Sequence, residues 1–185
     1  TDASVIVGPA AAHFGWGRAD YDRLAGAVAA GHVIECGVQA TGGNFSFVTE
    51  LPDGGRRPGF PIGEVYADGS AVITKHPGTG GAVTVETVTA QLLYEIGAPA
   101  YLGPDVVTHL DTVTLDADGP DRVRLTGTRG SPPPPTLKVG VNNLGVVAGS
   151  TPVNGGSLFG GLDLGATGTI GMPPTLLTMP LEENA

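Results

Sequence analysis

The pattern of apolar positions in the first part of the chain predicts a strand, a helix and a second strand. Residues 5–7 form an apolar run that is typical of a short strand. Residues 20–30 carry apolar side chains at helical spacing, with Asp20 as the expected N-cap and Gly31 as the expected stop. Residues 32–36 again resemble a short strand. Strand, helix, strand in this order favours a parallel sheet with crossover connections.

Two turn sequences predict β-hairpins further along the chain. Asp68-Gly69 separates apolar runs at residues 65–66 and 71–74, and this dipeptide is a strong short-range hairpin signal. Asp118-Gly119 has the same place in a second alternating segment, residues 112–126.

A second helix is expected over residues 84–96, where apolar side chains fall on one stripe. Residues 132–135 are four prolines and predict a stiff connector. Together the patterns predict an α/β fold with a mostly parallel sheet, flanking helices and antiparallel β-hairpins at one edge. The chain opens on its first apolar run, so we expect an incomplete domain.

Charge narrows the classes of partner. Acidic residues outnumber basic ones by 18 to 9, which makes the formal net charge −9. Nucleic acids and anionic membrane surfaces are bound through clustered Lys and Arg, so neither is expected as a partner. The sequence has no apolar run long enough for a transmembrane helix and no signal-peptide pattern. A cytoplasmic protein is therefore the expectation.

The first segment that could carry chemistry runs from residue 35 to residue 44, directly after a predicted strand. Gly42 and Gly43 would let main-chain N–H groups approach a ligand, and Asn44 adds a side-chain donor and acceptor. The alternative is a tight turn that needs glycine for its geometry. Glu35 is a candidate acid or base. Cys36 is a candidate nucleophile, or else a small core residue.

A second glycine-rich segment precedes the helix expected from residue 84. Lys75 would supply positive charge, while Gly80, Gly81 and Thr84 would offer donors to an anion at the helix N-terminus. The order of Lys and Gly differs from that of a phosphate-binding P-loop. The alternative is a structural loop with a solvated Lys75.

Glu64 is a further candidate general base, if it is buried; otherwise it is a solvated carboxylate. Cys36 is the only cysteine, and the four histidines show no ligand spacing. The sequence therefore predicts no metal site and names no cofactor.

Several blocks, read in order, carry a family resemblance. They are residues 34–37 with 40–45, 59–65, 72–75 with 78–81 and 83–88, 91–97 and 119–123. This series resembles the acyclic terpene utilisation family (AtuA-like proteins) over residues 1–145. The remaining residues, 146–185, form a divergent glycine-rich tail for which we predict no site.

The resemblance implies a bacterial protein of citronellol- and geraniol-type catabolism, whose intermediates are acyl-CoA thioesters. It also implies a missing N-terminal half, since a full family domain is more than twice this length. The leading hypothesis is an enzyme of acyl-CoA or related carboxylate metabolism. Gly80, Gly81, Thr84 and Lys75 would then hold an anion, Glu35 or Glu64 would act as acid or base, and Asn44 would orient a carbonyl.

Two alternatives stay open. The chain could be a non-catalytic partner subunit that scaffolds terpene-pathway enzymes, or an inactive truncated fragment. A homo-oligomer, or a separate N-terminal half, would complete an otherwise partial domain.

Overall fold

The computed structural model describes residues 3–139 and, beyond them, only short strand segments between residues 146 and 180. Contacts divide the chain into two units, Thr1–Pro134 and Pro135–Ala185. The domain boundary predicted at residue 145 lies outside the described residues.

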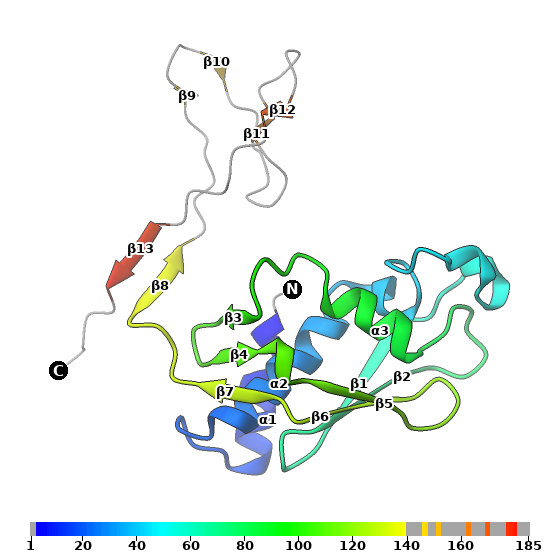
Figure 1. Ribbon diagram of the computed structural model, residues 1–185, viewed down its shortest axis with the longest axis horizontal. Coiled ribbons are helices and arrows are strands. Elements are labelled where there is room, and N and C mark those ends of the chain that lie inside the picture. Colours follow the sequence, from blue (N-terminus) through cyan, green and yellow to red (C-terminus); the bar gives the residue numbers. More distant parts are fainter. Residues whose placement is uncertain are drawn as a thin grey trace. The chain divides into compact units, whose positions relative to one another are not determined.

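One helix, α2 (Tyr21–Ile34), is the centre of the first unit (Figure 1). Its residues from Leu24 to Val33 are all buried. Two glycines let other segments approach its backbone. A Cβ on Gly26 would collide with the carbonyl group of Gly69, and one on Gly31 with that of Ala3. Glycine therefore serves close packing here rather than helix termination.

The two strands predicted around α2 are helical instead. Ala3–Ile6 is a 3₁₀ turn that leads into α1 (Val7–Phe14), and Pro9 is tolerated because the first turn needs no N–H donor. Residues 32–34 extend α2 past the predicted stop at Gly31. The strand–helix–strand unit is therefore absent, and with it the reason to expect parallel strands.

The larger sheet has the strand order β1-β2-β6-β5, and its strands are β1 (Pro61–Val65), β2 (Ala71–Lys75), β5 (Thr114–Ala117) and β6 (Val123–Thr126). All three neighbouring pairs are antiparallel. Both predicted hairpins are confirmed, since β1 pairs with β2 and β5 with β6.

A smaller sheet has the order β3-β4-β7, with strands β3 (Ala100–Leu102), β4 (Val107–His109) and β7 (Arg129–Ser131). Both of its pairs are antiparallel too. The prediction of a mostly parallel sheet was wrong: every strand pair that the structure describes is antiparallel. Helices and antiparallel sheets in one unit are the α+β arrangement.

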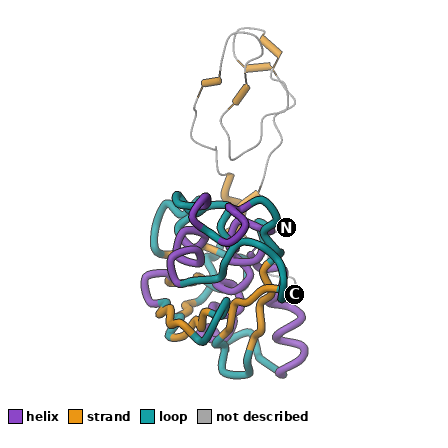
Figure 2. The backbone as a smooth tube through the Cα atoms, turned by 90° about the vertical axis from the view of Figure 1, so that its right-hand side faces the viewer, coloured by secondary structure: helices purple, strands orange, loops and turns teal. Residues whose placement is uncertain are grey.

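The core lies where α2 meets the sheets. Ala71, Ile73, Val123 and Leu125 point from the larger sheet into a cluster with the second half of α2. The first half of α2 packs in a second cluster with Val106, the residue before β4. Figure 2 shows the helical turns of this unit stacked against its strands. The outer face of the larger sheet carries Glu64 and Arg124 on either side of the buried Val72.

Helix α3 (Val85–Leu92) confirms the predicted second helix, though it ends one turn earlier than expected. Its N-terminus has a reciprocal capping box between Thr84 and Thr87. The other helical turns are 3₁₀ turns, at Gly37–Thr41, Val48–Glu50, Pro52–Gly55 and Leu110–Thr112.

Among the residues that the structure describes in the second unit, three strand pairs are antiparallel. They are β8 (Thr136–Val139) with β13 (Leu177–Pro180), β9 (Val146–Val147) with β10 (Thr151–Pro152), and β11 (Leu162–Asp163) with β12 (Thr169–Ile170). No predicted site residue falls in this unit.

Candidate functional site

The first predicted segment begins at the end of a helix, where a strand end was expected. Glu35 is the C-cap of α2 and donates its N–H to the Gly31 carbonyl at 2.9 Å. The chain then turns through Cys36, which is half-buried, and Gly37. Thr41, buried at the end of the following 3₁₀ turn, donates its hydroxyl to the Gly59 carbonyl at 2.7 Å. The segment is thereby fixed to the chain before β1.

Gly42 and Gly43 serve local packing. Gly42 has φ +131°, and a Cβ there would collide with the Leu51 side chain. A Cβ on Gly43 would collide with the side chain of Gln39. Their N–H groups donate to the carbonyls of Gln39 and Val38 at 3.2 and 3.1 Å. These donors are engaged within the segment, so a ligand role for the two glycines stays a prediction.

Asn44 and Glu35 are joined through two residues that the sequence did not single out. Asn44 Nδ2 donates to Gln91 Oε1 at 2.6 Å, and Gln91 Nε2 donates to the main-chain oxygen of His32 at 3.1 Å. The His32 ring then meets Glu35, with Nδ1 2.9 Å from Oε1. Gln91 is fully buried, so one side chain of α3 links the glycine-rich segment to the end of α2.

The His32–Glu35 pair is almost completely buried at the end of α2. The His32 side chain is 4% exposed and that of Glu35 13%. A carboxylate only accepts hydrogen bonds, so Nδ1 of His32 carries a proton. Nε2 is buried without a hydrogen-bond partner among the described residues. An unpaired buried polar atom costs about 1–3 kcal/mol.

The hydrogen-bond donors of the second predicted segment are already paired with other groups of the protein. The Lys75 side chain is 5% exposed, and its ammonium lies 3.2 Å from Asp121 Oδ2 and donates to the Thr79 carbonyl at 2.9 Å. Gly80 N–H donates to the Arg57 carbonyl at 2.8 Å. Gly81 N–H donates to a carbonyl as well, and Val83 N–H to Asp121. Anion binding here stays a prediction, and it would need these bonds to open.

Thr84 lies at the N-terminus of α3, as predicted, and its donors and acceptors are used there. Its hydroxyl accepts from the Thr87 N–H at 3.3 Å, and its own N–H donates to the Thr87 hydroxyl at 2.9 Å. The hydrogen bond from Thr84 lowers the pKa of Glu86 in the first turn. Thr84 thus caps the helix in this structure.

The two predicted segments do meet. Ala82 N–H donates to the Thr41 carbonyl at 3.0 Å, and Gly81 packs so closely on that carbonyl that a Cβ would collide with it. Lys75 and Glu64, by contrast, do not converge. They are three residues apart in sheet register, with Glu64 opposite Val72, so their side chains lie on opposite faces.

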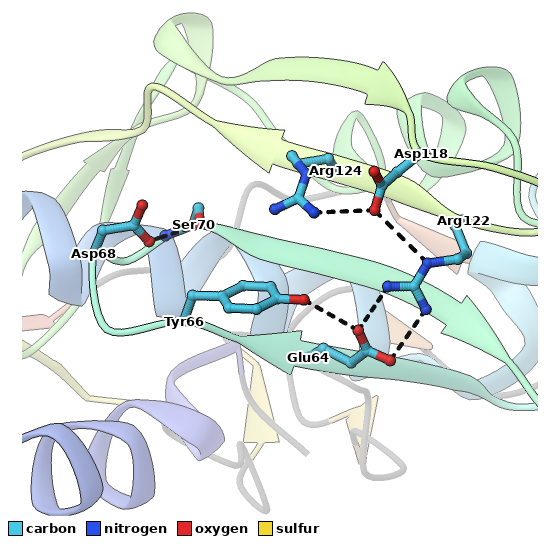
Figure 3. Close-up of polar contacts among 7 residues, drawn as sticks. All are labelled: Glu64, Tyr66, Asp68, Ser70, Asp118, Arg122 and Arg124. Atoms are coloured by element: carbon cyan, nitrogen blue, oxygen red, sulfur yellow. Dashed lines mark hydrogen bonds and ion pairs between the residues drawn. The ribbon is translucent and has the colours of Figure 1, made fainter.

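Glu64 belongs to a polar network on the outer face of the larger sheet (Figure 3). Arg122 binds both of its carboxylate oxygens, at 3.2 and 2.8 Å, and Tyr66 donates at 3.3 Å. Arg124 lies 5.4 Å from the centre of the Tyr66 ring and pairs with Asp118 at 3.1 Å. The hydrogen bonds from Arg122 lower the pKa of Glu64. A general base at neutral pH needs a raised pKa. This environment therefore favours a structural ion pair for Glu64 over the role of general base.

An exposed aromatic ring lies against the turn after α2. The Phe60 ring lies against Gly37, and its side chain is 67% exposed. Tyr94, 37% exposed, has its pKa raised by the charge of Glu95 and by a hydrogen bond to it, with a smaller contribution from Cys36. The end of α2 therefore places polar groups beside an apolar surface.

Sequence reasoning missed His32, Gln91 and the buried Thr108. The first two carried a signal in the pattern. His32 follows Leu24 and Val28 at helical spacing, and Gln91 lies on the apolar stripe of α3. A polar residue at a position predicted to be buried needs a hydrogen-bond partner, so such a position indicates a buried polar network.

The fold and the site define a small α+β domain whose polar network is built around one buried helix. The family model described as acyclic terpene utilisation family protein AtuA matches residues 1–157, and the chain belongs to this family. Comparisons with curated proteins and with solved structures found no match. Within the described residues, no helix is long and apolar enough to cross a membrane. In the same residues, no three or more potential metal ligands cluster.

Proposed function

We propose that this domain binds acyl thioester or carboxylate intermediates of acyclic terpenoid breakdown at the turn after α2. The observation that supports this most directly is the exposed Phe60 ring, which lies against Gly37 in this turn. Terpenoid acyl compounds combine a branched apolar chain with a polar head. An exposed ring suits the chain, while Glu35 and Asn44, at the two ends of the segment that begins here, would meet the carbonyl or thioester.

The polar groups have defined roles in this proposal. Asn44 Nδ2 uses one hydrogen on Gln91 and keeps a second for a substrate carbonyl. Glu35 is engaged by His32, so it would act together with that ring in any proton transfer. Cys36 is half-buried and would contact the acyl group.

Thermal unfolding in the presence of geranyl-CoA and of acetyl-CoA tests the proposal. A ligand that binds the native state raises the midpoint by mass action. We expect geranyl-CoA to raise it more than acetyl-CoA, because only the longer acyl chain covers the rings. A midpoint unchanged by either thioester would contradict the proposal.

The variant Phe60→Ala separates this surface from others. Burying a phenylalanine side chain is worth about 1.5–3 kcal/mol, so the variant should bind geranyl-CoA at least tenfold more weakly, measured by isothermal titration. Phe47→Ala is the matched control, because Phe47 is also exposed but packs on Phe45. Equal losses in both variants would place the acyl chain elsewhere.

The second candidate is a non-catalytic partner subunit. It is favoured by large exposed apolar side chains, since Leu93 and Tyr94 are exposed along with Phe60. Sedimentation of the chain and of Phe60→Asp discriminates the two. A complex that Phe60→Asp disrupts, together with no thioester binding, would favour the partner subunit.

A further inference from the structure

Strand β3 lies at one edge of the smaller sheet, outside β4 (Figure 1). The hydrogen bonds at its two ends define the pattern of the ladder. Gly103 N–H donates to the Val106 carbonyl at 3.1 Å after the strand, and Leu110 N–H donates to the Pro99 carbonyl at 2.9 Å before it. Hydrogen-bonded and non-hydrogen-bonded pairs alternate in an antiparallel ladder. The bonded pairs therefore fall on every second residue between these two ends.

Tyr101 is consequently the residue of β3 that bonds to β4, through its cross-strand neighbour Thr108. Ala100 and Leu102 lie at the alternate positions, so their N–H and C=O groups point away from β4 toward the open edge. Both residues are exposed, Leu102 to 42%. The edge thus offers two main-chain donors and two acceptors to another extended chain.

The other sheet edges of the first unit are protected. On β7, at the opposite side of the smaller sheet, the Gly130 N–H donates to Asp22 Oδ1 at 2.9 Å. None of the five residues of β1 is exposed. Strand β5 is exposed but carries Asp116, and a charged side chain discourages pairing at an edge. Strand β3 is protected only by its shortness.

Charge and register indicate which chain fits this edge. Residues 96–104 contain no charged side chain, in a protein whose formal net charge is −9. Two copies can therefore meet here without placing like charges opposite each other. The strand is also complementary to itself. A second copy, antiparallel and centred on Tyr101, places its own Leu102 opposite Ala100, so that donors meet acceptors on both sides of the centre.

We propose that β3 is a self-association edge, at which two copies of this chain pair antiparallel and symmetrically about Tyr101. The two smaller sheets then form one continuous sheet through their β3 strands. Pro99 and Pro104 confine the pairing to three residues, because proline has no N–H to donate. So short an edge makes a weak, transient association. This proposal does not depend on the one made for acyl thioesters.

Hydrogen exchange of the intact chain, followed over about a hundredfold range of protein concentration, tests the proposal. The Ala100 and Leu102 amides should exchange rapidly in dilute solution and about threefold or more slowly at the highest concentration. The Tyr101 amide, bonded to Thr108, should exchange slowly throughout, and that of the exposed Asp105 rapidly throughout. Exchange at Ala100 and Leu102 that does not depend on concentration would overturn the proposal.

The variant Leu102→Pro removes one of the outward N–H groups. Proline is tolerated on an edge strand where the N–H faces away from the sheet, so the monomer should still fold. Sedimentation should show it associating about tenfold more weakly than the parent chain. Leu102→Ala is the matched control, because it keeps the N–H, and it should weaken association by about threefold at most. Equal losses in the two variants would show a side-chain contact in place of strand pairing and overturn the proposal.

Phe60→Asp separates this association from the partner-subunit surface considered above. Phe60 lies against Gly37 and not on β3, so this variant should self-associate as the parent chain does. A dimer that Phe60→Asp abolishes and Leu102→Pro leaves intact would overturn the proposal. A chain that sediments as a monomer at every concentration would do so as well, and the thioester proposal would be left to its own titration. If Leu102→Pro does not fold, hydrogen exchange of the parent chain still decides.

Discussion

Gln91 is the residue whose side chain joins the two halves of the candidate site. Its amide donates to His32 and accepts from Asn44, and it is fully buried. The change Gln91→Leu keeps the size of the side chain but leaves both partners unpaired. We expect it to lower the free energy of unfolding by about 1–3 kcal/mol in urea titrations.

The control for Gln91→Leu lies on the same helix. Thr89 donates its hydroxyl only to the carbonyl one turn back, at 2.7 Å, so Thr89→Val should stay within about 0.5 kcal/mol of the parent chain. A Gln91→Leu protein as stable as Thr89→Val would mean that water replaces both hydrogen bonds.

Lys75 is the second residue whose burial has an energetic consequence. The Lys75 side chain is almost fully buried, while that of its partner Asp121 is 40% exposed. Breaking a fully buried pair costs about 3–5 kcal/mol, so Lys75→Met should cost less than that, roughly 2 kcal/mol. A double-mutant cycle with Asp121→Asn measures the coupling between the two side chains.

The control is Arg57→Gln, which breaks an exposed pair with Asp53 and should change stability by less than about 1 kcal/mol. If Lys75→Met proves equally mild, the Lys75–Asp121 pair contributes nothing beyond a surface ion pair. Thioester binding that survives Lys75→Met would also argue against an anion site at this ammonium.

At the scale of elements, α2 depends on the absence of two side chains. Alanine normally stabilises a helix by about 1 kcal/mol relative to glycine. At Gly31 the added methyl group would collide with the Ala3 carbonyl, so Gly31→Ala should lower the unfolding midpoint instead. Gly8 in α1 is the matched position, because a Cβ there meets nothing within 4 Å.

Gly8→Ala should therefore raise the midpoint while Gly31→Ala lowers it, both followed by thermal unfolding. Effects of the same sign at the two positions would show that helix propensity, and not the contact with Ala3, decides the stability of α2.

The elements that the sequence predicted correctly are those whose signals are local. Asp68-Gly69 and Asp118-Gly119 specify their hairpins within a few residues, and the α3 cap lies within its own first turn. Gly31 was read as a helix stop because its partner, Ala3, is distant in the sequence. Because the predicted helix was too short, the apolar residues after it were assigned to a strand. This false strand led to the wrong prediction of a parallel sheet.

The same reason limits what could be predicted of the site. Glu35 and Asn44 were visible as polar residues near glycines. The network that joins them passes through Gln91, which is 59 residues from His32, and no spacing rule covers such a distance. The exposed position of Phe60 beside Gly37 likewise depends on tertiary packing.

At the scale of the whole molecule, acid should unfold this protein through its hydrogen-bonded carboxylates. The pKa of Asp22 is lowered by the Gly130 N–H and Arg129, that of Glu64 by Arg122, and that of Asp68 by Ser70. A lowered pKa in the folded state adds stability above the unfolded value, and that stability is lost as the pH falls through the folded value.

The free energy of unfolding should therefore decline as the pH drops below the ordinary glutamate value of 4.5. Urea titrations at a series of pH values from 7 to 3 would measure the decline. Glu64→Gln should make it shallower, whereas Glu50→Gln, at an exposed position, should leave its slope unchanged. A Glu64→Gln profile parallel to that of the parent chain would contradict the role given to Arg122.

The close backbone contacts of α2 also have an evolutionary consequence. Gly26 and Gly31, and Gly130 against the Tyr21 carbonyl, leave no room for even one methyl group. A larger residue at any of these positions requires a neighbouring segment to retreat at the same time, so no single substitution leads to a tolerated intermediate. Natural variants should keep the three glycines, although the apolar residues around them change. Gly8, where a Cβ meets nothing, should be replaced by other residues.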